Sequence, residues 1–318
     1  MFRQFDSLFA MLQVFTDEEK CVDHFRAVRW PNGVACPHCG SVKIYHLSNG
    51  THKCGESQCA EKFSVRYDTI FEDSKISLQK WFMAIYLVTS HKKGVSSCQL
   101  ARDIKVTQKS AWHMLHRIRA AIEVDRSELL SGTVEIDETY VGGKEKNKHV
   151  SKRTKGAQGA GSAKSKTVVL GMIERGGNLR MNTIVSAKSE HIKPLVVANV
   201  CPSAIVNTDE GTQYNWMRDN YKHSLVKHAM GEYVRGDSYT NTIENAFGHF
   251  KRSITGIYHK ASDKHINRYL NMFAWRWNSR SMGEGERVNA LLKSAVGRTL
   301  TYRALIRKQN HESKICKS

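Results

Sequence analysis

The sequence predicts a multidomain α+β protein with a small cysteine-held hairpin domain, a helical domain and a larger domain built on a mixed sheet. Three observations support this. Four cysteines fall within residues 36–59, helical periodicity follows over 78–124, and strand-like and helical segments then alternate from residue 132 onward. With 318 residues, the chain is long enough for two or three cores.

The charge balance is strongly basic. The chain has 49 Lys and Arg against 30 Asp and Glu, a formal net charge of +19, and the basic residues are spread along its whole length. This predicts a polyanionic partner, most often nucleic acid, bound over an extended surface. No apolar run approaches the roughly 20 residues that span a bilayer, and the first residues lack the pattern of a secretory signal. We therefore expect no membrane association and a cytoplasmic, nucleoid-associated protein.

The first sharp motif is a pair of cysteine pairs. Residues 1–28 are predicted to be a helical packing or dimer-contact element, and residues 29–72 follow as a zinc ribbon. In the ribbon two close pairs flank a short hairpin and would hold one structural Zn²⁺ through four thiolates: Cys36, Cys39, Cys54 and Cys59. A set of unrelated thiols is the alternative. His38 and His52 could compete as ligands, but four cysteines already complete the shell.

Residues 75–127 have the layout of a helix-turn-helix domain. Helical periodicity begins near residue 78, and two further helices follow, separated by a short turn at residues 106–107. In this motif the last helix enters the major groove with its N-terminal side chains. The predicted base readers are Gln108, Lys109 and His113, and the predicted phosphate contacts are Arg117 and Arg119. The alternative is an ordinary three-helix bundle.

Residues 132–140 alternate as a strand and place Asp137 near its middle. A carboxylate there costs desolvation unless something compensates it, so a bound cation is one interpretation and a solvated edge position the other. The run 142–166 that follows is rich in Lys, Gly and Ser and is predicted to be a basic loop that binds phosphate without reading sequence.

The next segments continue the sheet. Residues 167–174 and 179–186 are predicted to form a hairpin, and a helix follows over 189–200. A short apolar strand at 204–207 then leads to Asp209, where open α/β sheets place their sites. A turn-forming aspartate is the other interpretation. A short helix and a possible fifth strand at 223–228 come next.

A helix within residues 236–252 carries the third acid. On a helical wheel Glu244 and Lys251 fall together on the edge of an apolar stripe, which favours them as a functional pair beside the core. Thr240 and Asn241 can cap this helix, and the spacing from Asn241 to Glu244 is that of a capping box. Glu244 is therefore either a capping residue or a functional acid.

The predicted order of strands and helices matches the ribonuclease-H-like arrangement. In that fold the first strand holds one acid, the fourth strand ends in another and a late helix supplies the third, which are the places of Asp137, Asp209 and Glu244. Carboxylates that converge from three elements repel one another unless divalent cations bind, as in two-metal phosphoryl transfer.

Several long motifs in one order resemble those of a known family. They are CPHCG, QLARDIKVTQKSAWHMLHRIR, VEIDETYVGGK, NTDEG and YTNTIENAFGHFKRSITGIYHKAS. The sequence resembles prokaryotic insertion-sequence transposases that join an N-terminal zinc ribbon to a DDE-type, ribonuclease-H-like catalytic domain. The resemblance covers nearly the whole chain and implies a catalytic domain over 131–282 and a C-terminal basic tail over 283–318.

The resemblance also implies roles for single residues. Asp137, Asp209 and Glu244 would be the metal-binding triad for two Mg²⁺ or Mn²⁺ ions, and Lys251 would contact DNA near the cut. The segment 252–264 would hold the DNA backbone, with the candidate contacts Arg252, Tyr258 and His259.

The implied activity is DNA transposition. Water would attack a phosphodiester at the transposon end, and the freed 3′-OH would attack target DNA. Pairing two ends favours a homodimer or a larger assembly on DNA. Two alternatives stay open: a DNA-binding regulator whose acids are structural remnants, and a nuclease that cuts without joining.

Overall fold

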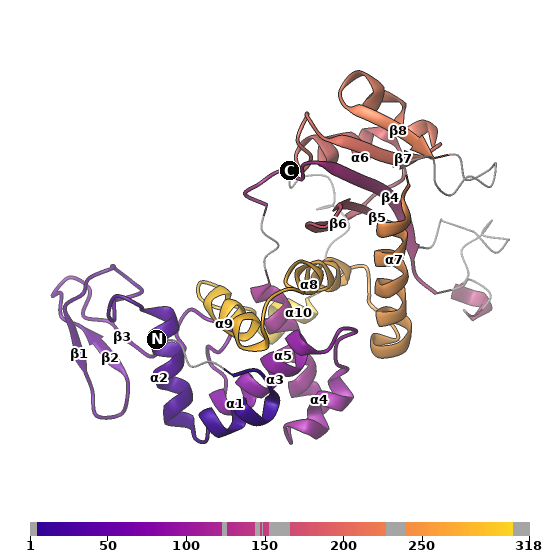
Figure 1. Ribbon diagram of the computed structural model, residues 1–318. Helices are drawn as coiled ribbons and strands as arrows, with labels where there is room; N and C mark the ends of the chain where they lie inside the picture. Colours follow the sequence, from indigo (N-terminus) through magenta and orange to yellow (C-terminus); the bar gives the residue numbers. More distant parts are fainter. Residues whose placement is uncertain are drawn as a thin grey trace. The chain divides into compact units, whose positions relative to one another are not determined.

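The structure is a computed structural model that describes residues 5–122, 126–143, 147, 149–152, 166–226 and 239–307. The chain divides into two compact units, Met1–Glu123 with Ser281–Ser318, and Val124–Arg280 (Figure 1). Each unit is described by itself below. The finer domain boundaries given above stay predictions.

The first unit begins with two helices. The helical N-terminal element is present, but as α1 (Leu8–Val14) and α2 (Glu18–Arg29) with a break between them. The break has a local cause, because the Asp17 side chain accepts the backbone N–H of Lys20 at 2.9 Å and so caps a new helix.

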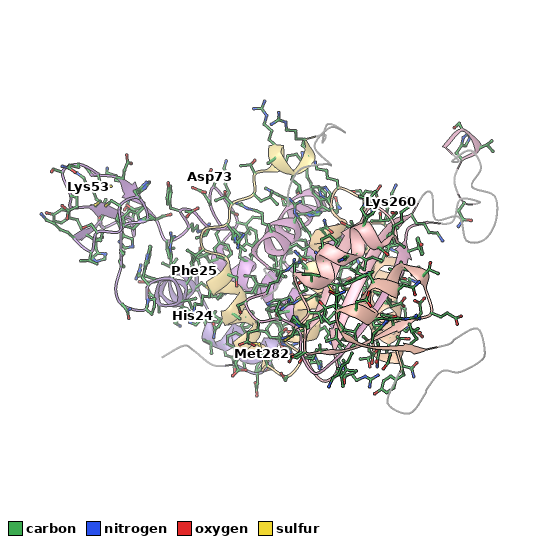
Figure 2. The ribbon with its side chains drawn as sticks, turned by 90° about the horizontal axis from the view of Figure 1, so that it is seen from above. His24, Phe25, Lys53, Asp73, Lys260 and Met282 are labelled. Atoms are coloured by element: carbon green, nitrogen blue, oxygen red, sulfur yellow. The ribbon has the colours of Figure 1, made fainter. Side chains whose placement is uncertain are left out.

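The ribbon follows α2 and is a three-stranded antiparallel sheet in the order β1-β2-β3. Its strands are short: β1 (Ile44–His46), β2 (His52–Cys54) and β3 (Lys62–Phe63). The expected hairpin is β1 and β2, and Figure 2 labels Lys53 in the middle of β2. Phe63 is buried with Cys36 and Cys54, so a few apolar side chains pack against the cysteine cluster.

The three helices predicted for the next segment are present as α3 (Leu78–Ser90), α4 (Ser97–Asp103) and α5 (Gln108–Ala121). Their N-caps are Ser77, Ser96 and Thr107, each accepting a first-turn N–H. Lys105 adopts a φ of 51° in the turn between α4 and α5, which lets the chain reverse within a few residues.

The C-terminal segment differs from the predicted basic tail. Its described part forms α9 (Glu284–Ser294) and α10 (Tyr302–Ile306), and α9 contacts α2 and α3. The reason is an apolar stripe on α9 that becomes buried, made of Val288, Leu291 and Leu292. On α2, Phe25 is buried beside His24, whose Nε2 lies 2.8 Å from Asn289 Oδ1 of α9 (Figure 2).

The second unit is built on a five-stranded sheet in the order β6-β5-β4-β7-β8. The strands are β4 (Thr133–Val141), β5 (Thr167–Glu174), β6 (Leu179–Ile184), β7 (Ile205–Asp209) and β8 (Lys222–Val226). β4, β5 and β6 pair antiparallel, whereas β7 and β8 continue from β4 in parallel. This is the predicted ribonuclease-H-like sheet. Most of the predicted basic loop lies outside the described residues, apart from a short 3₁₀ turn, η2 (Val150–Lys152).

Helices cover both faces of this sheet (Figure 1). One face packs against α6 (Ser189–Val197) and the 3₁₀ helix η4 (Thr212–Asp219). The other packs against α7 (Asn241–Ser253), its π-helical extension η6 (Ile254–Tyr258) and α8 (Ile266–Asn278). The predicted apolar stripe of α7 is confirmed, because Ile243, Phe247 and Phe250 are buried. Within the described ranges, no helix is long and apolar enough to cross a membrane.

Candidate functional site

The acids of β4 alternate between the two faces of the sheet. Glu135 contacts the start of α7, so Asp137, two residues on, lies on that same face. Glu138 points toward the other face, where it accepts hydrogen bonds from two residues of η4. The donors are the Tyr214 hydroxyl and Gln213 Nε2, the latter at 3.1 Å. A single strand thus delivers carboxylates to both helical layers.

Asp209 ends the neighbouring parallel strand β7. Glu135 is paired with Asn207, so Asp137 and Asp209 stand two residues further along their strands, at the carboxyl-end side of that pair. The backbone N–H of Gly211 donates to Asp209 Oδ1 at 3.0 Å, which fixes the carboxylate at the turn after the strand. The sheet therefore brings the first two predicted acids together.

Glu244 reaches this edge from α7. Its neighbour Ile243 is buried against β5, where a methyl group added to Gly171 would lie 2.7 Å from both Ile243 Cδ1 and Phe247 Cε1. α7 thus packs directly on the backbone of β5. Glu244 itself stays exposed on the helix.

Electrostatics tie the three acids to one site. The pKa of Asp137 is raised from 3.8 to about 7, chiefly by burial and also by the charges of Glu138, Asp209 and Glu244, against the lowering effect of the Glu138 backbone N–H. The charges of both other members of the predicted triad, Asp209 and Glu244, therefore raise the pKa of Asp137. A proton or a cation is needed to relieve the repulsion.

The donor set suits a hard divalent cation, because carboxylate oxygens are the ligands that Mg²⁺ and Mn²⁺ prefer. The three carboxylates are less closely gathered than the cysteines. Among the described residues, the four cysteines are the only set of three or more ligating groups whose donor atoms all lie within 4.8 Å of one another. Like charges without a cation between them stay apart, so a bound ion would draw these side chains inward.

Glu138 is a half-buried acid for which the sequence predicts no role. Burial raises its pKa, the hydrogen bond from Tyr214 lowers it and the charge of Asp209 raises it again. Tyr214 is itself buried, and its pKa is raised by burial and by the charge of Glu138. The signal in the sequence was the Asp-Glu pair within one strand, which must place its two carboxylates on opposite faces.

The capping box predicted at the start of α7 is wrong. Thr240 is the N-cap but makes no side-chain cap bond, and its hydroxyl donates to Glu244 Oε1 at 3.2 Å. The backbone N–H groups of Thr242 and Ile243 instead donate to Glu135 of β4, at 2.9 and 3.0 Å. The cap comes from a residue more than a hundred positions away, which a local spacing rule cannot find.

Lys251 is exposed and lies seven residues beyond Glu244 on α7, two helical turns or about 10 Å along the axis. Arg252 and His259 are also exposed, and His259 has a φ of 57° just after η6. Lys260, labelled in Figure 2, follows in the same exposed segment. Tyr258 is different: it packs on the core, with its ring 4.8 Å from that of Tyr269, so it is poorly placed to stack on a base.

The predicted readers on α5 are engaged within their own unit. Gln108 Nε2 donates to Ser97 Oγ at 2.8 Å, and Lys109 Nζ lies 4.8 Å from the ring centroid of Tyr302. His113 Nε2 lies 3.1 Å from the Leu300 carbonyl. The C-terminal segment therefore contacts the first two turns of α5.

Arg117 and Arg119, the predicted phosphate contacts, are buried. The Arg117 guanidinium donates to the Glu72 carbonyl and lies over the Trp81 ring. It holds α5 to the rest of the unit, and the burial of both arginines places them poorly for the predicted phosphate contacts.

The ribbon holds a tight cluster of thiols. The Sγ atoms of Cys36 and Cys59 are 3.8 Å apart and those of Cys39 and Cys54 are 3.6 Å apart. Four sulfurs around a tetrahedral Zn²⁺ at about 2.3 Å stand roughly 3.8 Å from one another. The four predicted ligands, whose sulfur atoms all lie within 4.8 Å of one another, are therefore gathered closely enough to hold structural zinc. His52 is buried beside them and pairs with His46 at 2.9 Å.

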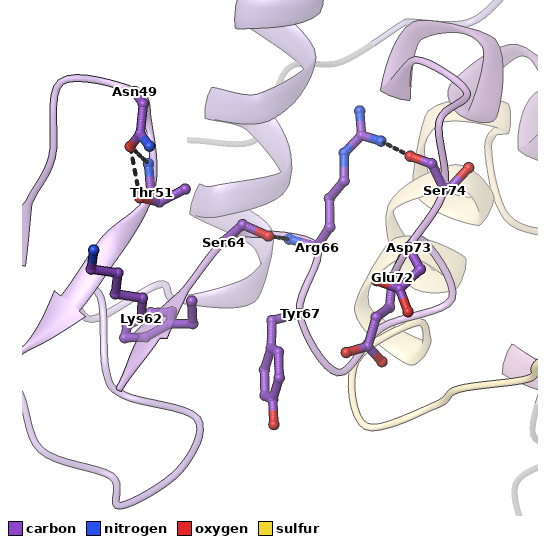
Figure 3. A pocket seen from close by; sticks show the side chains of 10 residues that line it. Asn49, Thr51, Lys62, Ser64, Arg66, Tyr67, Glu72, Asp73 and Ser74 are labelled. Carbon is purple, nitrogen blue, oxygen red and sulfur yellow. Dashed lines mark hydrogen bonds between the residues drawn. The ribbon is translucent and has the colours of Figure 1, made fainter. Parts of the chain in front are cut away.

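A pocket of about 400 Å³ lies beside the ribbon and is separate from the acids (Figure 3). Its walls combine Lys62 and Arg66 with Glu72 and Asp73. The Arg66 guanidinium is already bonded to the carbonyls of Ser74 and Ile76, at 2.8 and 3.0 Å. Because its walls carry both signs of charge and Arg66 is bonded to backbone carbonyls, we interpret this pocket as a structural contact between β3 and the segment before α3.

Comparison with known proteins agrees with the description of both the zinc ribbon and the domain built on the five-stranded sheet. Residues 129–278 match the family model of the ISXO2-like transposase domain, and residues 16–62 match that of the transposase zinc-ribbon domain. Fold and motifs thus define a zinc-ribbon protein with a DDE-type transposase domain. The chain thus carries a transposase zinc-ribbon domain and an ISXO2-like transposase domain.

One relative aligns along almost the full length. A protein of Halobacterium salinarum described as "Uncharacterized protein in transposable element ISH50" is 28% identical over 297 residues, covering 90% of this chain and 99% of the relative.

Two solved structures are distantly similar. The Mos1 strand transfer complex matches with a TM-score of 0.23 and 14% identity, covering 67% of this chain and 77% of that one. A simian T-cell lymphotropic virus intasome matches with a TM-score of 0.26 and 15% identity, covering 58% of this chain and 61% of that one. The fold assignment rests on the strand order and register given above.

Proposed function

We propose that this protein is an active DNA transposase that cuts at the ends of its own mobile element and joins them to target DNA. The observation that carries the proposal is the register that sets Asp137 and Asp209 side by side on β4 and β7, with the start of α7, which carries Glu244, bonded to the same face of β4. The pKa of Asp137, raised to about 7 mainly by burial and also by Glu138, Asp209 and Glu244, agrees with this placement. Three acids from β4, β7 and α7 thus act on one another at one edge of a ribonuclease-H-like sheet. A stable protein retains such a repulsive cluster where a cation is to be bound.

Asp137, Asp209 and Glu244 would hold two divalent ions, Mg²⁺ or Mn²⁺. When bound, these ions would supply an activated water and stabilise the charge of the leaving oxygen. Glu138 is assigned to the support of this cluster, because Tyr214 and Gln213 fix its carboxylate on the far face of the same strand.

The proposed reaction has two balanced steps. Water attacks a phosphodiester at the element's end, its oxygen binds phosphorus, and the bond to the 3′ oxygen breaks to leave a 3′-OH and a 5′-phosphate. The 3′-OH then attacks a target phosphodiester and displaces another 3′-OH. The number of phosphodiester bonds is conserved in the second step, so no external energy source is required.

DNA would be held by exposed basic residues of the second unit. Lys251 projects from the same helix as Glu244 and is the proposed contact near the cut, with Arg252 and His259 further along the backbone. In the first unit we propose Gln108, Lys109 and His113 of α5 as contacts to the element's end. Reading two ends together favours at least a dimer on DNA. A cytoplasmic, nucleoid-associated location stays a prediction.

The test is a cleavage and strand-transfer assay with the full chain, zinc-loaded, on duplexes that carry the terminal sequences flanking its gene. We expect Mg²⁺- or Mn²⁺-dependent nicking and joining, lost at least a thousandfold in Asp137→Asn, Asp209→Asn and Glu244→Gln. Glu190→Gln, an exposed acid on α6, is the matched control. Sequence-specific binding without any cleavage would favour a regulator, and cleavage without joining would favour a nuclease.

A further inference from the structure

A second buried acid lies two residues before Asp137, on the same face of β4. Glu135 is fully buried, and its carboxylate meets four donors. Oε1 accepts Arg175 Nε at 2.7 Å and the Thr242 hydroxyl at 2.9 Å, and Oε2 accepts the backbone N–H groups of Thr242 and Ile243. A carboxylate has about four acceptor positions, so Glu135 is saturated.

This saturation separates Glu135 from the proposed metal ligands. To bind an ion it would have to release a backbone N–H or the Arg175 guanidinium inside a buried site, which would leave a buried donor without an acceptor. Glu135 therefore has a structural role, in which it holds the start of α7 and Arg175, and does not serve as a metal ligand.

Arg175 extends the contact to the segment before α7. Its Nη2 donates to the Tyr239 carbonyl at 2.9 Å, and its guanidinium lies 3.5 Å from the centroid of the Tyr239 ring. Asn207 of β7 donates to the same carbonyl at 3.4 Å. The start of α7 is thus tied to β4, β5 and β7 at once.

We propose that Glu135 and Arg175 form a clamp that positions Glu244 against Asp137 and Asp209. This rests on the proposed function of the three acids. The connection is short: Asp137 is two residues from Glu135 on β4, and Glu244 follows Ile243, whose N–H the clamp holds. The aligned peptide dipoles at the start of α7 favour the negative charge of Glu135, and Arg175 offsets that charge within the core.

The clamp explains why α7 needs no local cap. Thr240 makes no side-chain cap bond, so the first-turn amides of α7 depend on β4. A local cap would fix the helix end but leave it free to shift on the sheet. A cap supplied by the strand that carries Asp137 fixes the helix end to the site itself.

The test compares Mn²⁺ binding to the zinc-loaded full chain by electron paramagnetic resonance, for wild type, Glu135→Gln and Asp137→Asn. The glutamine has a similar shape, but its amide nitrogen cannot accept, so about half of the donors lose their acceptor. We expect Glu135→Gln to weaken Mn²⁺ binding about 10- to 100-fold, as loss of a group that orients metal ligands does. Glu190→Gln is the control and should bind as wild type does.

Hydrogen exchange supplies a second readout. The amides of Thr242 and Ile243 should exchange at least tenfold faster in Glu135→Gln, while those of the opposite-face helix α6 stay unchanged. If Glu135→Gln fails to fold, Thr242→Ala removes one donor only and should give a smaller change in the same direction. Arg175→Lys keeps the charge but loses the second bond to Tyr239. Its Mn²⁺ affinity and its amide exchange rates should therefore lie between those of wild type and Glu135→Gln.

The outcomes separate the clamp from the proposed function. If Asp137→Asn binds Mn²⁺ as tightly as wild type, the metal assignment itself fails. If Asp137→Asn loses binding while Glu135→Gln lowers only the unfolding temperature and keeps wild-type Mn²⁺ affinity, the clamp is merely structural and the positioning role is overturned.

Discussion

Asp137 of β4 and Gly171 of β5 are paired directly across the sheet, and the missing side chain at Gly171 makes room for α7. The proposed site thus depends on a glycine that takes no part in the chemistry. Its partner across the strands is Asp137, which the proposed metal site requires to lie near α7 and Glu244. In the proposed site, the depth at which α7 sits on β5 would set how near Glu244 comes to Asp137.

Gly171→Ala should therefore displace α7. The added methyl would lie 2.7 Å from Ile243 Cδ1 and from the Phe247 ring, which is closer than van der Waals contact allows. We expect a loss of about 1–3 kcal/mol in urea unfolding, typical of overpacking, with a larger proportional loss of DNA cleavage. Gly283→Ala is the control, because a methyl there would make only ordinary contacts, at 3.7 Å or more, and lies outside the proposed site. Full cleavage by a destabilised Gly171→Ala would show that the depth of α7 is not critical.

Metal binding should depend on pH through Asp137. Its pKa of about 7 lies above the usual 3.8, so below pH 7 the folded protein holds a proton that a cation must displace. Mn²⁺ affinity should fall by up to about tenfold per unit as pH drops from 7 to 5, and level off above pH 8. Calorimetric titrations at several pH values measure this. A flat profile between pH 5 and 8 would contradict the raised pKa.

Zinc content should follow the four cysteines. We expect roughly one zinc per chain by mass spectrometry of the metal, and less than a tenth of that in Cys39→Ser, with loss of the ribbon's fold. Cys98→Ser is the control, since this exposed cysteine lies on α4 outside the cluster. Full zinc retention in Cys39→Ser would place the ion elsewhere.

Lys251→Gln should weaken DNA binding in a salt-dependent way. Removing one phosphate contact lowers the slope of log affinity against log salt by about one. Cleavage should fall more than binding, because Lys251 shares a helix face with Glu244. Lys188→Gln, an exposed lysine just before α6, tests whether any lost charge has this effect. Equal losses in the two variants would remove the special role of Lys251.

The sequence predicted most of the sheet and the zinc cluster, since both follow from short-range patterns. Alternation marked the strands around Asp137, and cysteine spacing marked the ribbon. The resemblance to a transposase family agrees with the matches of residues 129–278 and 16–62 to transposase domain models. The stripe on α7 was visible because its period follows the helix.

What the sequence could not show were contacts between distant residues. Glu135 caps a helix more than a hundred residues away, and Gly171 matters because of which helix crosses it. Arg117 looked like a phosphate contact by charge alone, yet it is buried against Glu72 and Trp81. Charge and spacing give the type of a side chain and its face, but its partner is decided by tertiary packing.

The most direct test of the central claim is anomalous diffraction from crystals of the zinc-loaded full chain grown with Mn²⁺. The account predicts manganese peaks bounded by Asp137, Asp209 and Glu244, together with one zinc peak among the four cysteines. Manganese bound elsewhere, with these three carboxylates left without an ion at saturating Mn²⁺, would contradict it.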